Sequence, residues 1–401
     1  MVSENKVELN KGLRSGYYDR TESSLIVPKP GKLLYRGYNI DDLARYSTFE
    51  ETTYLLLYGS LPTRSQCDEL TSRLVSLRSL PPQVLETIAT YRDSHPMDAL
   101  RAAVSAMSIS DPDVEDNSHE GILDKGIRMV AATPAMVAAH HRIRSGLDPI
   151  EPDESLTHAA SFLHLLFGEH PDPEDAKLID KDFLLHAEHG SNASTFAGRV
   201  AASTGADFYS AMTSAVSVLK GPKHGGAAEA VIRMAHDVGS EENAEAYVES
   251  VIGNRGRIPG FGHPVYQDID PRSVHLRADA KALGERKGQP KWFAIIEAVA
   301  NSHAMRRRAK LGINPNVDLW SGAIYSLLNI PEDLFVPLFA IGRIPGWTLH
   351  LLEQYASRDI LRPRLYYKRQ EGPGVRPDGP AAMTPSRELS RARARPERDG
   401  R

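Results

Sequence analysis

Apolar residues at helical spacing recur along most of the chain, and this pattern constrains the fold more than any other feature. Leu70, Leu74 and Leu77 form one face of an amphipathic helix, and Thr63 and Gln66 before them form a capping box. Similar patterns cover 49–58, 127–145, 155–167, 177–188, 207–219, 226–237, 242–252, 273–287, 292–309, 321–328 and 345–358. Strand patterns are confined to 24–27 and 32–38. The sequence therefore predicts a mainly α fold with a small N-terminal β-hairpin.

Composition and charge exclude several classes of protein. The length of 401 residues suggests two or three domains. With 48 basic and 52 acidic residues, the net charge of −4 gives no electrostatic footprint for nucleic acid. No apolar run approaches a membrane span, and the first fifteen residues have no apolar core of a secretory signal. The single Cys67 excludes disulfide scaffolds and cysteine-clustered metal sites. We expect a cytoplasmic globular enzyme or binding module, with no nucleic-acid or membrane partner.

Residues 371–401 differ from the rest of the chain in composition. They hold seven arginines and five prolines, and Val375 and Leu389 are the only branched aliphatic residues. Such a segment buries too little apolar surface to offset its ordering entropy, so we predict a disordered tail. The alternative is an RNA-binding or anionic-surface role for the basic run 391–395.

Three histidines stand in turns rich in glycine and proline. The turns are 186–192, 221–226 and 259–264, and they carry His189, His224 and His263. Glycine lets a backbone approach a ligand closely, and proline fixes the direction of the chain. A histidine held in such a turn can donate a hydrogen bond to a developing oxyanion. Ordinary turns with incidental histidines are the alternative.

One carboxylate and three arginines complete the candidate set. Asp318 follows a proline turn and opens an apolar helix, so its pKa is expected to be raised, as suits a general base. A plain helix N-cap is the alternative for Asp318. Arg272, Arg343 and Arg362 are guanidinium groups that would suit a di- or tricarboxylate substrate, unless each forms a structural ion pair.

Common motifs for other chemistries are absent from the sequence. There is no phosphate-binding loop, no dinucleotide-binding glycine motif after a strand, and no nucleophile elbow. His186 and His189 flank Glu188, but no spacing supplies a third ligand, so we predict no metal site.

Five motifs in order resemble the citrate synthase family. They are His-Ala-Glu-His-Gly-Ser-Asn-Ala-Ser-Thr-Phe (186–196), Gly-Pro-Lys-His-Gly-Gly-Ala (221–227), Gly-Phe-Gly-His-Pro-Val-Tyr (260–266), Asp-Pro-Arg (270–272) and Pro-Asn-Val-Asp (315–318). The similarity extends from about Gly12 to Tyr367 and includes Leu34–Ile40 and Phe339–Trp347.

This resemblance implies a two-domain, almost all-helical homodimer that closes over its substrates. The large domain would comprise 1–221 and 322–370, and the small domain 222–321. The implied reaction is a Claisen-type condensation of an acyl-CoA with a 2-oxo acid, followed by thioester hydrolysis. It implies no metal and no cofactor, with acetyl-CoA as co-substrate.

The resemblance also implies a role for each site residue. Asp318 would take the α-proton of the thioester, His224 would stabilise the enolate, and His263 would polarise and protonate the ketone of oxaloacetate. The remaining contacts would be His189, Asn192, Arg272 and Arg343 with oxaloacetate, Arg362 reaching from the other subunit, and Gly256, Arg257, Ile258, Pro259 and Gly260 with CoA.

Two departures concern the acyl substrate. Pro264 stands where many citrate synthases have arginine, and Ser94-His-Pro-Met-Asp98 with Gly-Phe-Gly-His-Pro resembles 2-methylcitrate synthases, which use propionyl-CoA. One methylene in an apolar pocket separates two substrates by only about 1–3 kcal/mol. We favour citrate synthase over 2-methylcitrate synthase. Citryl-CoA cleavage and a catalytically silent CoA-binding paralogue are further alternatives, although the three catalytic residues are all retained.

Overall fold

The computed structural model describes residues 10–13 and 16–365, and the predicted tail at 371–401 lies outside them. Residues 19–361 form one compact unit, and the described residues 10–13, 16–18 and 362–365 belong to a second unit. The helices of the compact unit are α1 (Ile40–Tyr46), α2 (Phe49–Tyr58), α3 (Arg64–Ser76), α4 (Pro82–Thr90), α5 (Pro96–Ala106), α6 (His119–Arg144), α7 (His158–Phe167), α8 (Pro173–His186), α9 (Ala193–Ser203), α10 (Phe208–Leu219), α11 (Ala227–Val238), α12 (Ala244–Gly253), α13 (Pro271–Arg286), α14 (Lys291–Asn301), α15 (His303–Ala309), α16 (Asp318–Leu327) and α17 (Phe335–Ser357). The mainly helical prediction is confirmed.

A small antiparallel sheet lies near the N-terminus, as predicted, with one strand more than a hairpin. Strands β1 (Ser24–Val27), β2 (Lys32–Tyr35) and β3 (Tyr38–Asn39) pair in the order β1-β2-β3. Leu33 and Tyr35 on β2 are fully buried, while Lys32 is exposed. The alternation gives this sheet one face toward the helices.

Helix ends follow local capping chemistry. Thr63 and Gln66 form the predicted capping box of α3, and Thr48 with Glu51 forms another at α2. The predicted helix over 292–309 is instead two helices, because Ser302 leaves the helical conformation and caps α15 by accepting the N–H of Met305. Helices α1, α4 and α9 were not predicted.

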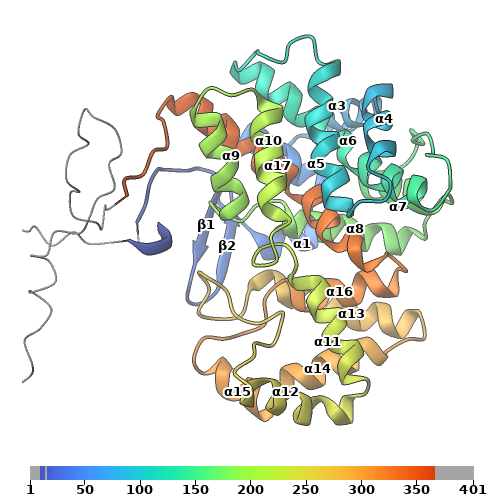
Figure 1. Ribbon diagram of the computed structural model, residues 1–401, viewed down its shortest axis with the longest axis vertical. Coiled ribbons are helices and arrows are strands. Elements are labelled where there is room, and N and C mark those ends of the chain that lie inside the picture. The colour runs from blue at the N-terminus through green and yellow to red at the C-terminus, as the bar shows by residue number, and fades with distance from the viewer. Residues whose placement is uncertain (1–9, 14–15, 366–401) are drawn as a thin grey trace, which may run out of the picture. The chain divides into compact units, whose positions relative to one another are not determined.

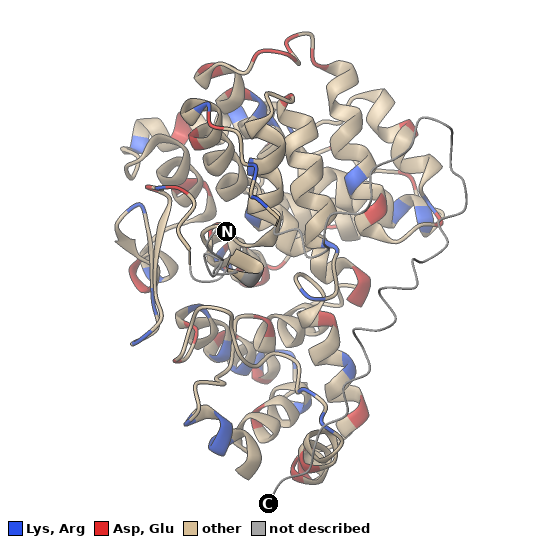
Figure 2. Ribbon diagram, turned by 60° about the vertical axis from the view of Figure 1, so that its left-hand side comes forward, with Lys and Arg blue, Asp and Glu red and all other residues tan. Residues whose placement is uncertain are grey.

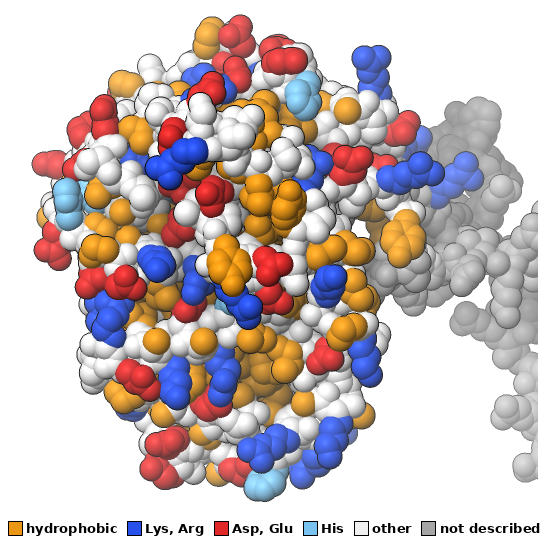
Figure 3. Space-filling view, turned by 180° about the vertical axis from the view of Figure 1, so that it is seen from behind, with side chains coloured by type: hydrophobic (Ala, Val, Ile, Leu, Met, Phe, Trp, Pro, Cys, Tyr) orange, Lys and Arg blue, Asp and Glu red, His pale blue; other side chains and the backbone are white. Residues whose placement is uncertain are grey.

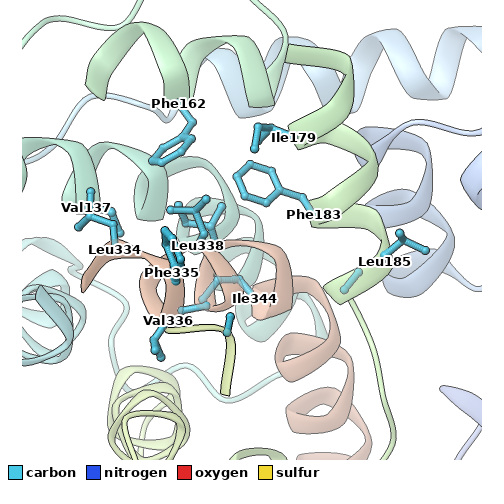
Figure 4. Close-up of a cluster of buried hydrophobic side chains, with 14 of the residues drawn as sticks. Val137, Phe162, Ile179, Phe183, Leu185, Leu334, Phe335, Val336, Leu338 and Ile344 are labelled. Atoms are coloured by element: carbon cyan, nitrogen blue, oxygen red, sulfur yellow. The ribbon is translucent and has the colours of Figure 1, made fainter. Parts of the chain in front are cut away.

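Helix α17 runs through the middle of the helical layers (Figure 1). The stretch Glu332–Ser357 is long and apolar enough to cross a membrane, with mean hydropathy 1.2, but 94% of its apolar window is buried inside the protein. The prediction that no apolar run approaches a membrane span overlooked this stretch. Its burial identifies it as a core helix. Figure 4 shows Phe335 and Leu338 of α17 facing Phe162 of α7 and Phe183 of α8.

Helices α11 to α16 gather in one region of the compact unit, and most of the remaining helices lie in the other (Figure 1). The predicted boundary between 321 and 322 falls within α16, and the division into two domains stays a prediction. Basic and acidic side chains occur on helices of both regions (Figure 2), and they are interspersed on the face drawn in Figure 3. This distribution agrees with a net charge near zero.

Candidate active site

Two loops that carry predicted catalytic residues are tied together by backbone hydrogen bonds. The Asn316 N–H donates to the Gly260 carbonyl at 3.0 Å, and the Gly262 N–H donates to the Asn314 carbonyl at 2.8 Å. Gly260 has φ +77°, and a Cβ there would lie 2.7 Å from Leu319 Cδ1. Only glycine fits, because the α16 backbone passes directly against this turn. The pairing fixes His263 and Asp318 relative to each other.

His263 is held as a neutral imidazole with a defined tautomer. Its Nδ1 accepts the backbone N–H groups of Val265 at 3.0 Å and Tyr266 at 3.1 Å. The ring proton is therefore on Nε2. Burial, with the nearby Arg272 charge, lowers the pKa of His263 to about 4. At neutral pH this side chain can donate one hydrogen bond from Nε2 without carrying a charge.

His189 lies beside His263 in the buried part of the site. The two ring centroids are 4.9 Å apart, and His189 Nε2 lies 3.1 Å from the Tyr266 hydroxyl. Burial and the charge of Arg272 hold the pKa of His189 well below its ordinary value. His189 is thus a neutral hydrogen-bonding group.

Asp318 is the first residue of α16, with Val317 as the N-cap, so the alternative N-cap interpretation is off by one residue. Its backbone N–H donates to Asn316 Oδ1 at 3.1 Å. Burial raises the pKa of the Asp318 carboxyl to about 6, although His186 and Arg272 counteract part of the effect. A carboxylate of this basicity is a better proton acceptor than an exposed aspartate.

His224 lies in the turn between α10 and α11 and contacts Ser194. Its Nε2 lies 2.8 Å from Ser194 Oγ and 3.4 Å from the Ser194 backbone N–H, which can only donate. These contacts engage Nε2 and leave Nδ1 as the ring nitrogen available to a ligand. Burial, followed by the Arg343 charge, lowers the pKa of His224 to about 4. His224 is therefore a second neutral imidazole at neutral pH.

The two buried arginines differ in how they are paired. Arg272 forms a double hydrogen bond with Asp270, at 3.0 Å and 2.7 Å, which matches the structural ion pair given as the alternative. Arg343 donates from Nε to the His186 carbonyl at 2.5 Å, while its buried Nη1 has no hydrogen-bond partner. Burial lowers the pKa of Arg343 to about 10, so it stays charged. Arg343 thus has a free donor for an anion.

The structure gives less direct evidence on the other predicted substrate contacts. Asn192 caps α9, its Oδ1 accepting the N–H groups of Ser194 and Thr195, both at 3.1 Å. In the segment predicted for CoA, Arg257 is exposed, Gly256, Pro259 and Gly260 are partly or fully buried, and Ile258 is 4% exposed within the core. Arg362 is exposed and belongs to the second unit. Their roles stay predictions.

One group of side chains has the spacing of a metal site. The ligand atoms of His189, His263 and Asp270 lie within 4.8 Å of one another. However, both Asp270 oxygens pair with Arg272, and His263 Nδ1 accepts two backbone N–H groups. A cation would have to displace these donors beside a fixed guanidinium. The donor set fits an anion or a carbonyl oxygen better than a metal ion.

Several residues that shape the site had no role predicted from the sequence. They are His186, Glu188, Ser194, Tyr266, Asp270, Phe339, Trp347 and His350, most of them inside the matched motifs. Ser194 accepts the Trp347 indole N–H at 3.2 Å, and Phe339 lies 4.7 Å under the Arg343 guanidinium. The matched motifs contain most of these residues, but residue types alone do not show which side chains face into the site.

The arrangement joins a carboxylate of raised pKa, two neutral imidazoles and a buried guanidinium. Such groups remove a proton from carbon and stabilise charge on oxygen. The fold and the site together define a class of protein whose buried groups are suited to acid–base chemistry on carbonyl compounds.

Comparison with known proteins identifies the family to which the chain belongs. The family model "Citrate synthase, C-terminal domain" matches residues 12–364. The citrate synthase of Haloferax volcanii is 42% identical over 366 residues, covering 90% of this chain and 96% of that protein. A protein named 2-methylcitrate synthase 2 from Corynebacterium glutamicum is 38% identical over 383 residues, covering 94% and 99%.

A solved structure agrees with these matches. The ternary complex of carboxymethyl coenzyme A and oxaloacetate with citrate synthase from Thermoplasma acidophilum superposes with a TM-score of 0.87, at 30% identity, and covers 92% of this chain and 99% of that chain. The chain belongs to the citrate synthase family, whose members are condensing acyltransferases.

Proposed function

We propose that the chain condenses acetyl-CoA with oxaloacetate and water to give citrate and free CoA. The observation that carries the proposal is the combination of Asp318, whose pKa is raised to about 6, with two histidines kept neutral by burial. The proposal also draws on the relatives named citrate synthase.

Enolate formation is the first step. The Asp318 carboxylate takes a proton from the methyl carbon of the acetyl thioester, and the electron pair moves onto the thioester oxygen. His224 donates from Nδ1 to that oxygen, because its Nε2 is engaged by Ser194. A neutral donor suits this task, since an imidazolium would protonate the enolate rather than hold it for reaction.

Bond formation follows at the ketone of oxaloacetate. The enolate carbon attacks the ketone carbon, and His263 transfers its Nε2 proton to the ketone oxygen, which becomes the hydroxyl of citryl-CoA. Water then adds to the thioester carbonyl, the C–S bond breaks, and CoA leaves as the thiol. Over the cycle, Asp318 returns its proton and His263 recovers one.

Oxaloacetate is held by fixed donors in this proposal. Arg343 offers its unpartnered Nη1, His189 lies beside His263, and Arg272 contributes its charge while paired with Asp270. Asn192, three residues after His189, is proposed as a further contact. Arg362 is proposed to reach the site of the other subunit in a homodimer. Residues 256–260 are proposed to receive CoA, and a cytoplasmic location is part of the same proposal.

A 2-methylcitrate synthase using propionyl-CoA is the second candidate. The Corynebacterium glutamicum relative carries that name and matches over 99% of its length. Pro264 and the Ser94–Asp98 motif also favour it. His95 is exposed and caps α5 by accepting the Met97 N–H at 3.1 Å, which is a structural use of that motif. We therefore place acetyl-CoA first.

The ratio of kcat/KM for acetyl-CoA to that for propionyl-CoA, at fixed oxaloacetate, tests the choice. A ratio above one supports citrate synthesis, and a ratio below one supports 2-methylcitrate synthesis. Failure of both thioesters to release CoA would refute either activity and favour a silent paralogue.

A further inference from the structure

A buried carboxylate lies directly behind the predicted oxaloacetate site. Glu188 precedes His189 in the chain and has no exposed surface. One oxygen, Oε1, receives the Gly190 N–H at 2.5 Å, the Ser24 hydroxyl at 2.9 Å and His350 Nε2 at 3.0 Å. Its own backbone N–H donates to the Tyr35 hydroxyl at 3.2 Å. The carboxylate therefore ties Gly190, the residue after His189, to Ser24 of β1 and His350 of α17.

The turn depends on the hydrogen bonds of the Glu188 carboxylate because its backbone conformation is unusual. Gly190 has φ +59°, and Gly346 of α17 approaches so closely that a Cβ there would lie 2.1 Å from the Ala187 carbonyl oxygen. The Gly190 N–H points inward to Glu188 and not to a helix or strand partner. Without the carboxylate, the partly buried Gly190 N–H would lose its partner, which is unfavourable.

The charged His350 side chain stabilises the ionised form of Glu188. His350 of α17 lies between Glu188 and Glu353, at 3.0 Å and 3.6 Å. Burial works to lower the pKa of His350, but the two carboxylates outweigh it and raise the value to about 9. Arg199 binds Glu353 at 2.9 Å on the far side. We call Glu188, His350, Glu353 and Arg199 the Glu188 network.

The network also acts on the anion-binding arginine. The Glu188 charge opposes the effect of burial on the pKa of Arg343, which helps to keep that guanidinium charged. Glu188 Oε2 is buried and has no hydrogen-bond partner, so it acts on Arg343 through its charge alone. One carboxylate thus influences both His189 and Arg343, which the proposed function assigns to oxaloacetate.

We propose that Glu188 is a positioning residue for oxaloacetate: it fixes the turn carrying His189 and balances the charge of Arg343, without touching substrate. This inference rests on the proposed function. It predicts a defect specific to one of the two substrates, which a merely structural role would not produce.

The test compares Glu188→Gln with Glu353→Gln in the full-length protein. Both substitutions remove one carboxylate charge from the same His350, but Glu353 does not contact the His189 turn. Glu188→Gln is expected to raise the KM for oxaloacetate about tenfold, as loss of a charged hydrogen bond implies. Its KM for acetyl-CoA should stay within about twofold of wild type, since no CoA contact changes. Calorimetric titration of oxaloacetate without acyl-CoA should show the same weakening.

The control should behave differently. Glu353→Gln is expected to lower Tm as much as Glu188→Gln while leaving the KM for oxaloacetate within about twofold of wild type. Equal KM changes in the two variants, or an unchanged KM in Glu188→Gln, would overturn the positioning role. A wild-type protein that releases no CoA from either thioester would instead refute the proposed function.

A milder variant covers the case in which Glu188→Gln does not fold. Ser24→Ala removes one donor to Glu188 Oε1 from the partly exposed strand β1. A single neutral hydrogen bond contributes about 0.5–1.5 kcal/mol, so the KM for oxaloacetate should rise about two- to tenfold. No change in Ser24→Ala would then count against the role.

Discussion

A single methyl group added at Gly260 should affect both the stability of the fold and the positioning of the catalytic residues. In Gly260→Ala the new Cβ would meet Leu319 Cδ1 at 2.7 Å, Val231 Cγ2 at 2.9 Å and Leu319 Cα at 3.0 Å. The positive φ costs about 1–2 kcal/mol for a non-glycine residue, and overpacking adds about 1–3 kcal/mol. We expect the free energy of unfolding to fall by about 2–5 kcal/mol.

The same substitution should reduce turnover in the molecules that remain folded. The Gly260 carbonyl accepts the Asn316 N–H, and Leu319 follows Asp318, so relief of the clash moves the loops that carry His263 and Asp318 apart. A displacement of about 1 Å can cost about a hundredfold in rate. The assay is kcat/KM for acetyl-CoA at a temperature where circular dichroism shows the variant folded.

Gly288→Ala is the matched control for Gly260→Ala. Gly288 has φ +66°, but a Cβ there meets nothing within 4 Å. It should lose only about 1–2 kcal/mol of stability and keep wild-type kcat/KM. If folded Gly260→Ala also kept wild-type kcat/KM, the claim that this loop pairing positions the two catalytic groups would be refuted.

Three further predictions concern Asp318, Ser194 and Phe183. Because Asp318 acts as a carboxylate and its pKa is about 6, kcat/KM should rise with pH through about 6 and level off above it; a pH profile flat from 5 to 8 would contradict this. Ser194→Ala removes the hydroxyl that lies 2.8 Å from His224 and should lower kcat about tenfold in steady-state kinetics, whereas a wild-type kcat would contradict a role for this contact. Phe183→Ala empties a fully buried position and should lower the free energy of unfolding by about 3–5 kcal/mol in a urea titration, whereas a loss below 1 kcal/mol would contradict the packing in Figure 4.

Periodicity predicted helix α2 with its correct ends and placed α10 and α11 within one residue. It failed for α9 (Ala193–Ser203), because that helix is rich in small and polar residues and its first turn falls inside a catalytic motif. It also began α17 ten residues late, since Pro337 and Pro345 resemble helix breaks. Pro337 lies in the first turn of α17, where its missing N–H has no intrahelical partner to lose, and Pro345 lies inside the buried helix, where packing and not local sequence decides its conformation.

Motif spacing predicted which residues lie together better than it predicted side-chain pairing. His189 and His263 lie together, as expected, and Asp318 has the raised pKa that its apolar neighbours suggested. The pairing of Arg272 with Asp270 depends on how α13 begins, and the contact between Glu188 and His350 joins residues far apart in sequence. Long-range contacts of this kind follow from packing and not from spacing.

Release of CoA from acetyl-CoA, measured as free thiol with and without oxaloacetate, tests the central claim most directly when wild type is compared with Asp318→Asn. Wild type should release thiol only when oxaloacetate is present. Asp318→Asn should release almost none, although it still binds oxaloacetate in calorimetry. Turnover near the wild-type rate in Asp318→Asn would contradict the assignment of the base, and thiol release from wild type that does not depend on oxaloacetate would contradict the condensation itself.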